Sequence, residues 1–249
     1  MAEKSMKRTL LIVSCVVLML SVAGRLPAQT ARKTIGAGRG KSTSTASRRS
    51  LMRPASLNQR APALYRARFT STQGDFVIEV TRAWAPLGAD RFYNLVKNGF
   101  FTDASFFRVV PGFVVQFGIP AKPEIGKAWA HATIKDDPVV QSNTAGTVTF
   151  ATGGPDTRSS QVFINLRDNS NLDGQGFSAF GKVTDGMDVV EKLYSGYGDG
   201  PPFGNGPDQG RLTNEGKAYL DKNFPRVDSI KSAVVVKSPA AAAGTAPKK

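Results

Sequence analysis

Two strongly polar side chains interrupt an otherwise apolar stretch near the middle of the chain. The segment FFRVVPGFVVQFG, residues 106–118, places Arg108 and Gln116 among phenylalanines and valines. Burying an unpaired arginine is costly, so Arg108 must reach solvent, find a partner or face a cavity that a ligand fills. Core packing gives no reason for either residue, and both are therefore candidates for a binding or catalytic site.

Other groups that could carry out covalent chemistry are scarce. The single histidine, His131, lies in AWAHATIKDDP, which has the composition of a surface loop, and the single cysteine, Cys15, lies in an apolar leader. The segment NSNLDG, residues 169–174, resembles the first half of a calcium loop, but Phe180 stands where a bidentate glutamate is required. We expect no metal and no cofactor. Two classes remain: a binding module, or an enzyme whose reaction makes and breaks no covalent bond.

The net charge of +14 is concentrated at the N-terminus. Residues 1–60 hold 12 of the 33 Lys and Arg against one acidic residue, whereas residues 61–249 hold the other 21 against 18 acidic residues. Three basic residues precede the apolar run LLIVSCVVLML, which is the layout of an export signal. We expect residues 1–28 to be a signal peptide or an uncleaved membrane anchor, and the protein to lie outside the cytoplasm, in the periplasm or the extracellular space.

Low-complexity segments flank the folded part. Residues 29–62 are rich in Gly, Ser, Thr and basic residues and contain no acidic residue, which predicts a flexible basic linker. Contact of residues 30–60 with an anionic surface is the functional alternative. Residues 238–249 are predicted to be a disordered tail. Nucleic-acid binding is not expected, because the charge lies outside the domain and an exported protein rarely meets nucleic acid.

The domain, residues 63–237, reads mainly as short strands. Alternating patterns predict a hairpin around Gln73-Gly74, followed by strands within 104–110, 113–118, 146–152, 160–166, 178–183 and 227–236. Helical spacing predicts helices over 85–99 and from residue 185, and a small helix over 214–220. Many short strands with two main helices favour a closed or nearly closed antiparallel barrel.

Three blocks in order resemble the signature blocks of the cyclophilin-type peptidyl-prolyl cis-trans isomerases. They are residues 106–118, then GTVTFATGGPDTRSSQVFINL at 146–166, then NLDGQGFSAFGKVTDGMDVVEKL at 171–193. The resemblance spans about residues 64 to 236. It implies a closed eight-stranded antiparallel barrel capped by two helices. It also implies catalysed rotation of X-Pro bonds in proline-containing polypeptides during protein folding. We expect a monomer.

The resemblance also implies roles for individual residues. Arg108 is the donor to the proline nitrogen, Gln116 binds the substrate backbone and Phe113 joins the proline pocket. The other residues expected around the substrate are Val114, Ala151, Thr152, Gln161, Phe163, Leu172 and Phe177, with Gly153, Thr157 and Ser160 at the rim of a neighbouring pocket.

Some positions depart from the family pattern. Thr152 stands where relatives usually have asparagine, Asn171 stands where the well-studied eukaryotic members have tryptophan, and Gly176-Phe177 replaces a loop histidine. These departures motivate an alternative function, a peptide-binding or chaperone module with weak or no isomerase activity.

Overall fold

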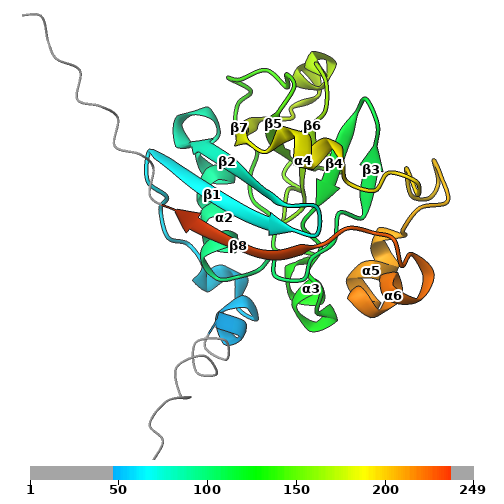
Figure 1. The fold of residues 1–249 in the computed structure, drawn as a ribbon. Helices are drawn as coiled ribbons and strands as arrows, with labels where there is room; N and C mark the ends of the chain where they lie inside the picture. Colours follow the sequence, from blue (N-terminus) through cyan, green and yellow to red (C-terminus); the bar gives the residue numbers. More distant parts are fainter. Residues whose placement is uncertain (1–46, 237–249) are drawn as a thin grey trace, which may run out of the picture. The chain divides into compact units, whose positions relative to one another are not determined.

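The computed structural model describes residues 47–236 (Figure 1). The predicted signal segment, the linker up to residue 46 and the tail from residue 237 lie outside the described residues. In chain order the elements are η1 (Pro54–Ser56), β1 (Leu64–Ser71), β2 (Asp75–Thr81), η2 (Arg82–Trp84), α2 (Pro86–Lys97), β3 (Arg108–Val110), β4 (Val114–Phe117), α3 (Pro123–Trp129), β5 (Thr147–Phe150), β6 (Val162–Asn165), η3 (Ser170–Gln175), β7 (Ala179–Asp185), α4 (Met187–Glu191), α5 (Gln209–Glu215), α6 (Lys217–Asn223) and β8 (Ile230–Val236).

The eight strands form one antiparallel sheet in the order β3-β4-β6-β5-β7-β2-β1-β8. The predicted hairpin is confirmed as β1 and β2, in which Thr70 pairs with Asp75 across the turn. Strands β1, β2 and β8 run side by side on the face shown in Figure 1.

The sheet curls but does not close, which corrects the predicted closed barrel. Its edge strands β3 and β8 share no ladder. Only the segment before β3 meets the start of β8, through an isolated bridge between Ser105 and Ser229 and a 2.8 Å bond from the Ile230 N–H to the Ala104 carbonyl. This pairing stops before β3, which is three residues long and forms its ladder with β4.

Phenylalanines fill the inside of the curl. Phe69 of β1 contacts Phe76, Phe92, Phe101 and Phe117 with ring centroids 5.1–6.0 Å apart, and all five are fully buried. Aromatic side chains bury large apolar areas. Phe92 belongs to α2, which packs against β7 and β8 and begins with Pro86 as the sequence predicts. This core is the rigid base on which the residues of β3, β4 and β6 are displayed.

The last part of the predicted flexible linker is packed against the domain, which corrects that prediction for residues 47–62. Leu51 and Ala61 are buried. The Trp129 indole N–H donates to the Leu51 carbonyl at 2.8 Å, and the Asn94 side chain exchanges hydrogen bonds with the backbone of Gln59. Composition alone hides this contact because the apolar anchors are isolated among basic and small residues.

Two helical regions also differ from the sequence-based expectation. The predicted small helix over 214–220 is a pair of short helices, α5 and α6, and α3 was not predicted. Helix α3 ends at the buried Trp129, just before the exposed His131. Within residues 47–236, no helix is both long and apolar enough to cross a membrane.

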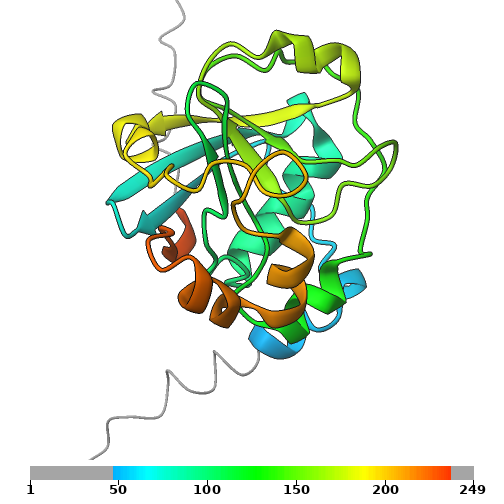
Figure 2. The ribbon, with the colours of Figure 1, turned by 90° about the vertical axis from the view of Figure 1, so that its right-hand side faces the viewer.

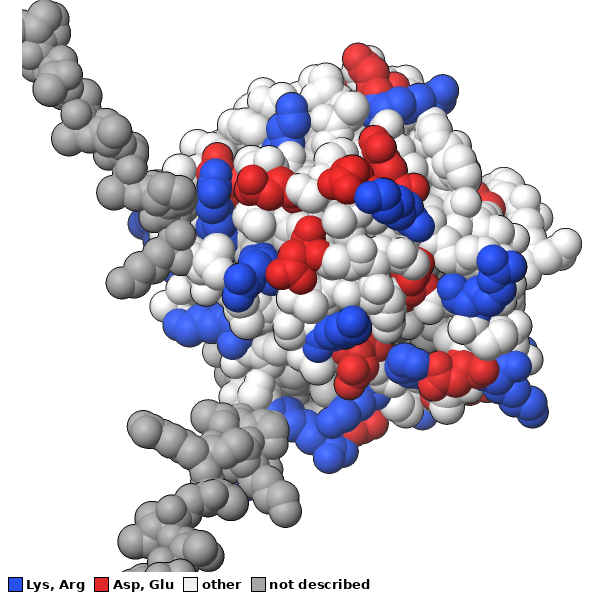
Figure 3. All heavy atoms as spheres, viewed as in Figure 1, with Lys and Arg blue, Asp and Glu red and all other residues white. Residues whose placement is uncertain are grey.

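Positive and negative side chains are interspersed on the face shown in Figure 3. No large area of one sign stands out on this face of the described domain, in agreement with its near balance of basic and acidic residues.

Candidate active site

Strand pairing brings the two polar residues of the apolar segment together. Arg108 of β3 is the register partner of Gln116 of β4, which in turn lies opposite Phe163 of β6. Arg108 Nη1 donates to Gln116 Oε1 at 3.1 Å, and Gln116 Nε2 donates to Gln161 Oε1 at 2.9 Å. This hydrogen-bond network fixes which atom of each glutamine side-chain amide is the oxygen and which is the nitrogen. Arg108 is therefore held by a chain of hydrogen bonds through Gln116 to Gln161.

A second partner of Arg108 comes from far along the chain. Arg108 Nε and Nη2 donate to Asp199 Oδ1 and Oδ2, both at 2.8 Å, in a bidentate ion pair. The hydrogen bonds from Arg108 lower the pKa of Asp199 below its usual value. The carboxylate is therefore ionised at neutral pH. Asp199 could not be identified from the sequence, because a glycine-rich loop carries no signal of which distant residue it meets.

Next to this pair lies an apolar pocket. Val114, Phe163 and Leu172 are buried together, and Phe113, Ala151 and Phe177 pack against them half-exposed. The rings of Phe163 and Phe177 meet edge to face, with centroids 5.7 Å apart. The Arg108 guanidinium lies 5.5 Å from the ring centroid of Phe113. A cavity of about 670 Å³ is lined by all these residues together with Gln116 and Gln161.

The rim predicted from the sequence is present with one exception. Thr152, Gly153 and Thr157 line the cavity, and the hydroxyls of Thr152 and Thr157 lie 2.8 Å apart. Ser160 does not line it. Its side chain is buried and its hydroxyl donates to the Gly118 carbonyl at 2.9 Å, beside a smaller cavity of about 230 Å³. The main cavity is lined at that point by Ser159, because alternate residues of an extended segment face opposite ways.

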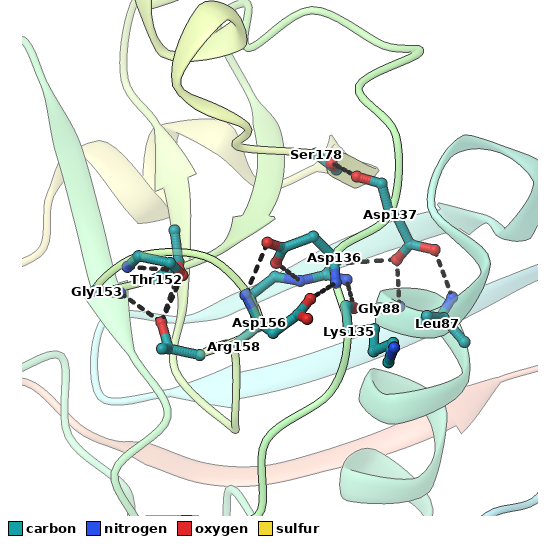
Figure 4. Close-up of polar contacts among 12 residues, drawn as sticks. Leu87, Gly88, Lys135, Asp136, Asp137, Thr152, Gly153, Asp156, Arg158 and Ser178 are labelled. Carbon is teal, nitrogen blue, oxygen red and sulfur yellow. Dashed lines mark hydrogen bonds and ion pairs between the residues drawn. The ribbon is translucent and has the colours of Figure 1, made fainter.

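An ion-pair network around the buried side chain of Arg158 supports this rim (Figure 4). Arg158 follows Thr157 and bonds through Nε to Asp136 and through Nη1 to Asp137, both at 3.1 Å. Asp137 also accepts the Leu87 and Gly88 N–H groups at the start of α2, each at 2.9 Å. The rim is thereby tied to the main helix of the core. This network was not predicted, because the charged segment that contains Asp136 and Asp137 has the composition of a surface loop.

Another wall of the cavity is formed by a loop to which no function could be assigned from the sequence. In Figure 2 the loop between α4 and α5, coloured yellow to orange, runs across the face turned to the viewer. Its cavity-lining residues are Asp199, Gly200, Pro201, Phe203, Pro207 and Asp208. Phe203 is the most exposed of the large apolar side chains among the described residues, at 85%.

The fold and the site together define a class of protein. A curled antiparallel sheet carries an open cavity with an apolar part and, beside it, one guanidinium and two side-chain amides. Among residues 47–236 no three His, Cys, Asp or Glu side chains gather as a metal site would require. The arrangement fits a domain that binds an extended peptide and places a hydrogen-bond donor beside it.

Comparison with known proteins identifies the family. The profile of the cyclophilin type peptidyl-prolyl cis-trans isomerase family matches residues 67–209, and the chain belongs to this family. A peptidyl-prolyl cis-trans isomerase of Acinetobacter baylyi is 38% identical over 125 residues, spanning 48% of this chain and 66% of the relative. Peptidyl-prolyl cis-trans isomerase A of Dickeya dadantii is 35% identical over 129 residues, spanning 50% and 68%. The chain is thus an enzyme of the peptidyl-prolyl isomerase class.

Solved structures agree on the fold. The crystal structure of a cyclophilin type peptidyl-prolyl cis-trans isomerase from Cryptosporidium parvum superposes with a TM-score of 0.53 at 21% identity, covering 71% of this chain and 99% of the other. A second structure of that protein, determined in the presence of the dipeptide Ala-Pro, gives a TM-score of 0.52 at 21% identity, covering 70% and 99%.

Proposed function

We propose that this isomerase acts on proline-containing polypeptides through Arg108, which donates a hydrogen bond to the proline nitrogen during rotation. Rotation about a peptide bond is opposed by roughly 18–20 kcal/mol because it breaks amide conjugation. In the twisted state the nitrogen lone pair is localised and accepts a donor that the planar ground state does not need. A donor fixed at the pocket wall therefore stabilises the transition state more than the substrate.

The observation that carries this proposal is the position of the Arg108 guanidinium beside the apolar cavity, 5.5 Å from the ring centroid of Phe113. Phe113, Phe163 and Leu172 offer an apolar surface for the proline ring. Gln116, beside them, fixes the flanking backbone. The solved relative studied with Ala-Pro supports a proline-containing ligand for this pocket.

Exchange NMR on a peptide containing Ala-Pro tests this function. The full chain is expected to accelerate the interconversion of the cis and trans peptide far above its spontaneous rate, which takes tens to hundreds of seconds. Line broadening of the peptide without any acceleration would instead support the alternative, a peptide-binding module. A chain that neither binds nor accelerates would overturn both.

We further propose that the protein acts outside the cytoplasm as a monomer, exported by residues 1–28, and assists the folding of exported proteins. The support is the arrangement of basic and apolar residues at the N-terminus.

The same composition supports contact of residues 30–60 with anionic surfaces. Arg32, Lys33, Arg39 and Lys41 precede the part packed on the domain. Each basic residue near an anionic membrane contributes about 1 kcal/mol. Changing these four residues to serine is therefore expected to lower binding to phosphatidylserine vesicles by at least about a hundredfold, measured by sedimentation of the chain without residues 1–28. Uncharged vesicles are the control, and binding that survives the substitutions would refute the electrostatic contact.

A further inference from the structure

Asp199 belongs to a loop that the proposed function does not use, yet it holds the residue on which that function depends. Resting on the proposed role of Arg108 as donor, we propose that Asp199 is a positioning residue for the isomerisation. Its carboxylate fixes the Arg108 guanidinium so that the remaining N–H groups meet the twisted peptide bond without first having to be ordered.

The geometry of the guanidinium supports positioning. Nε and Nη2 bond to the two oxygens of Asp199, and Nη1 bonds to Gln116. A bidentate pair sets the plane of the guanidinium as well as its distance. Arginine has five N–H groups, and these bonds use three of them. One hydrogen on each terminal nitrogen is left for a ligand, so Asp199 orients the donor and does not exhaust it.

The loop is built to keep the Asp199 carboxylate in this place. The Gly206 N–H donates to the Asp199 carbonyl at 2.8 Å, and the Gly200 N–H donates to Asp199 Oδ1 at 2.9 Å. A side chain at Gly204 would collide with the Asp199 carbonyl, and a Cβ at Gly206 would lie only 2.8 Å from it. Glycine is required where backbones approach this closely. The glycine-rich composition thus has a specific structural purpose around Asp199.

The location of the carboxylate favours positioning over obstruction of the substrate. Asp199 lies 91 residues after Arg108 in sequence and lines one wall of the cavity, whose volume of about 670 Å³ stays open beside it. The two side chains are similarly half-buried, at 21% and 27% exposure. The ion pair is sheltered enough to hold one geometry, and the cavity remains accessible to a peptide.

A double-mutant cycle tests the proposal in the full chain. Asp199→Ala is expected to lower kcat for an Ala-Pro peptide by about tenfold to a hundredfold, the range in which misplacing a catalytic group falls, with KM changed less than about twofold. In the Arg108→Ala background the same substitution is expected to change kcat by less than about twofold, because Asp199 acts only through Arg108. Asp199→Asn, which can accept only one of the two bonds, is expected to lie between wild type and Asp199→Ala.

Two further measurements keep the outcome decisive. Asp188→Asn removes an exposed carboxylate paired with Lys192 on α4 and is the matched control, expected to leave kcat unchanged. The Arg108 Nε–H resonance, assigned by its loss in Arg108→Ala, is expected to be protected from exchange in wild type and unprotected in Asp199→Ala. This spectrum reports directly whether Asp199 holds the guanidinium, even where the double variant is too slow to assay, and an Nε–H that stays protected in Asp199→Ala would contradict the proposal.

Several results would overturn the proposal. A kcat that rises in Asp199→Ala would make the carboxylate a competitor of the substrate, and an unchanged kcat would make the pair irrelevant. An equal fall in kcat in the wild-type and the Arg108→Ala backgrounds would mean that Asp199 acts through the structure of its loop and not through Arg108. An Arg108→Ala variant as active as wild type would instead refute the role of Arg108 in the proposed function.

Discussion

Replacing Arg108 by alanine is expected to lower kcat/KM for a proline-containing peptide by roughly a hundredfold, the usual cost of removing one transition-state donor. That corresponds to about 3 kcal/mol of lost transition-state stabilisation at about 1.4 kcal/mol per tenfold. The effect is large because the donor acts on a lone pair that is localised only in the twisted state, so its removal costs the transition state more than the bound substrate. Exchange NMR or a protease-coupled assay measures it directly.

Arg66 provides the matched control. It is also a half-buried strand arginine in an ion pair, bonded to Glu79 at 2.9 Å, but it does not line the cavity. Arg66→Ala is expected to keep kcat/KM within about twofold of wild type. If Arg108→Ala kept its activity to the same degree while thermal unfolding showed both variants folded, the donor would have to be sought elsewhere.

The sequence indicated Arg108 as a candidate site residue because a strongly polar residue in an apolar strand is a local signal, and the family resemblance supplied its expected role as donor. Arg108 and Gln116 stand out within thirteen residues, and the strand pairing that joins them follows from a short turn at Pro111-Gly112. The β1–β2 hairpin was predictable for the same reason. Each depends on interactions between residues close in the chain.

The contact between Asp199 and Arg108 was not predictable, because it depends on where a long loop returns to the sheet. The composition of the glycine-rich segment predicted an irregular backbone, but it gave no information about which residues that segment contacts. Leu51 and Trp129 illustrate the same limit, since 78 residues separate the carbonyl from the indole that bonds to it. An antiparallel sheet of short strands was predictable, whereas the lack of a ladder between the edge strands β3 and β8 depends on how two segments far apart in the chain meet.

The buried pair below the rim carries the largest expected effect on stability. Asp137→Ala is expected to lower the free energy of unfolding by about 3–5 kcal/mol, because it leaves the buried guanidinium of Arg158 without the one of its two carboxylate partners that is itself buried. It also removes the acceptor of the Leu87 and Gly88 N–H groups at the start of α2. Urea unfolding followed by tryptophan fluorescence measures the change.

Asp136 is a natural control for this experiment, since it is adjacent in sequence and bonds to the same arginine at the same 3.1 Å distance. Its side chain is 36% exposed, whereas that of Asp137 is 3% exposed. Solvent screens exposed ion pairs, which contribute about 0–1 kcal/mol, so Asp136→Ala is expected to cost no more than about 1 kcal/mol. Equal losses in the two variants would mean that burial does not set the strength of this network.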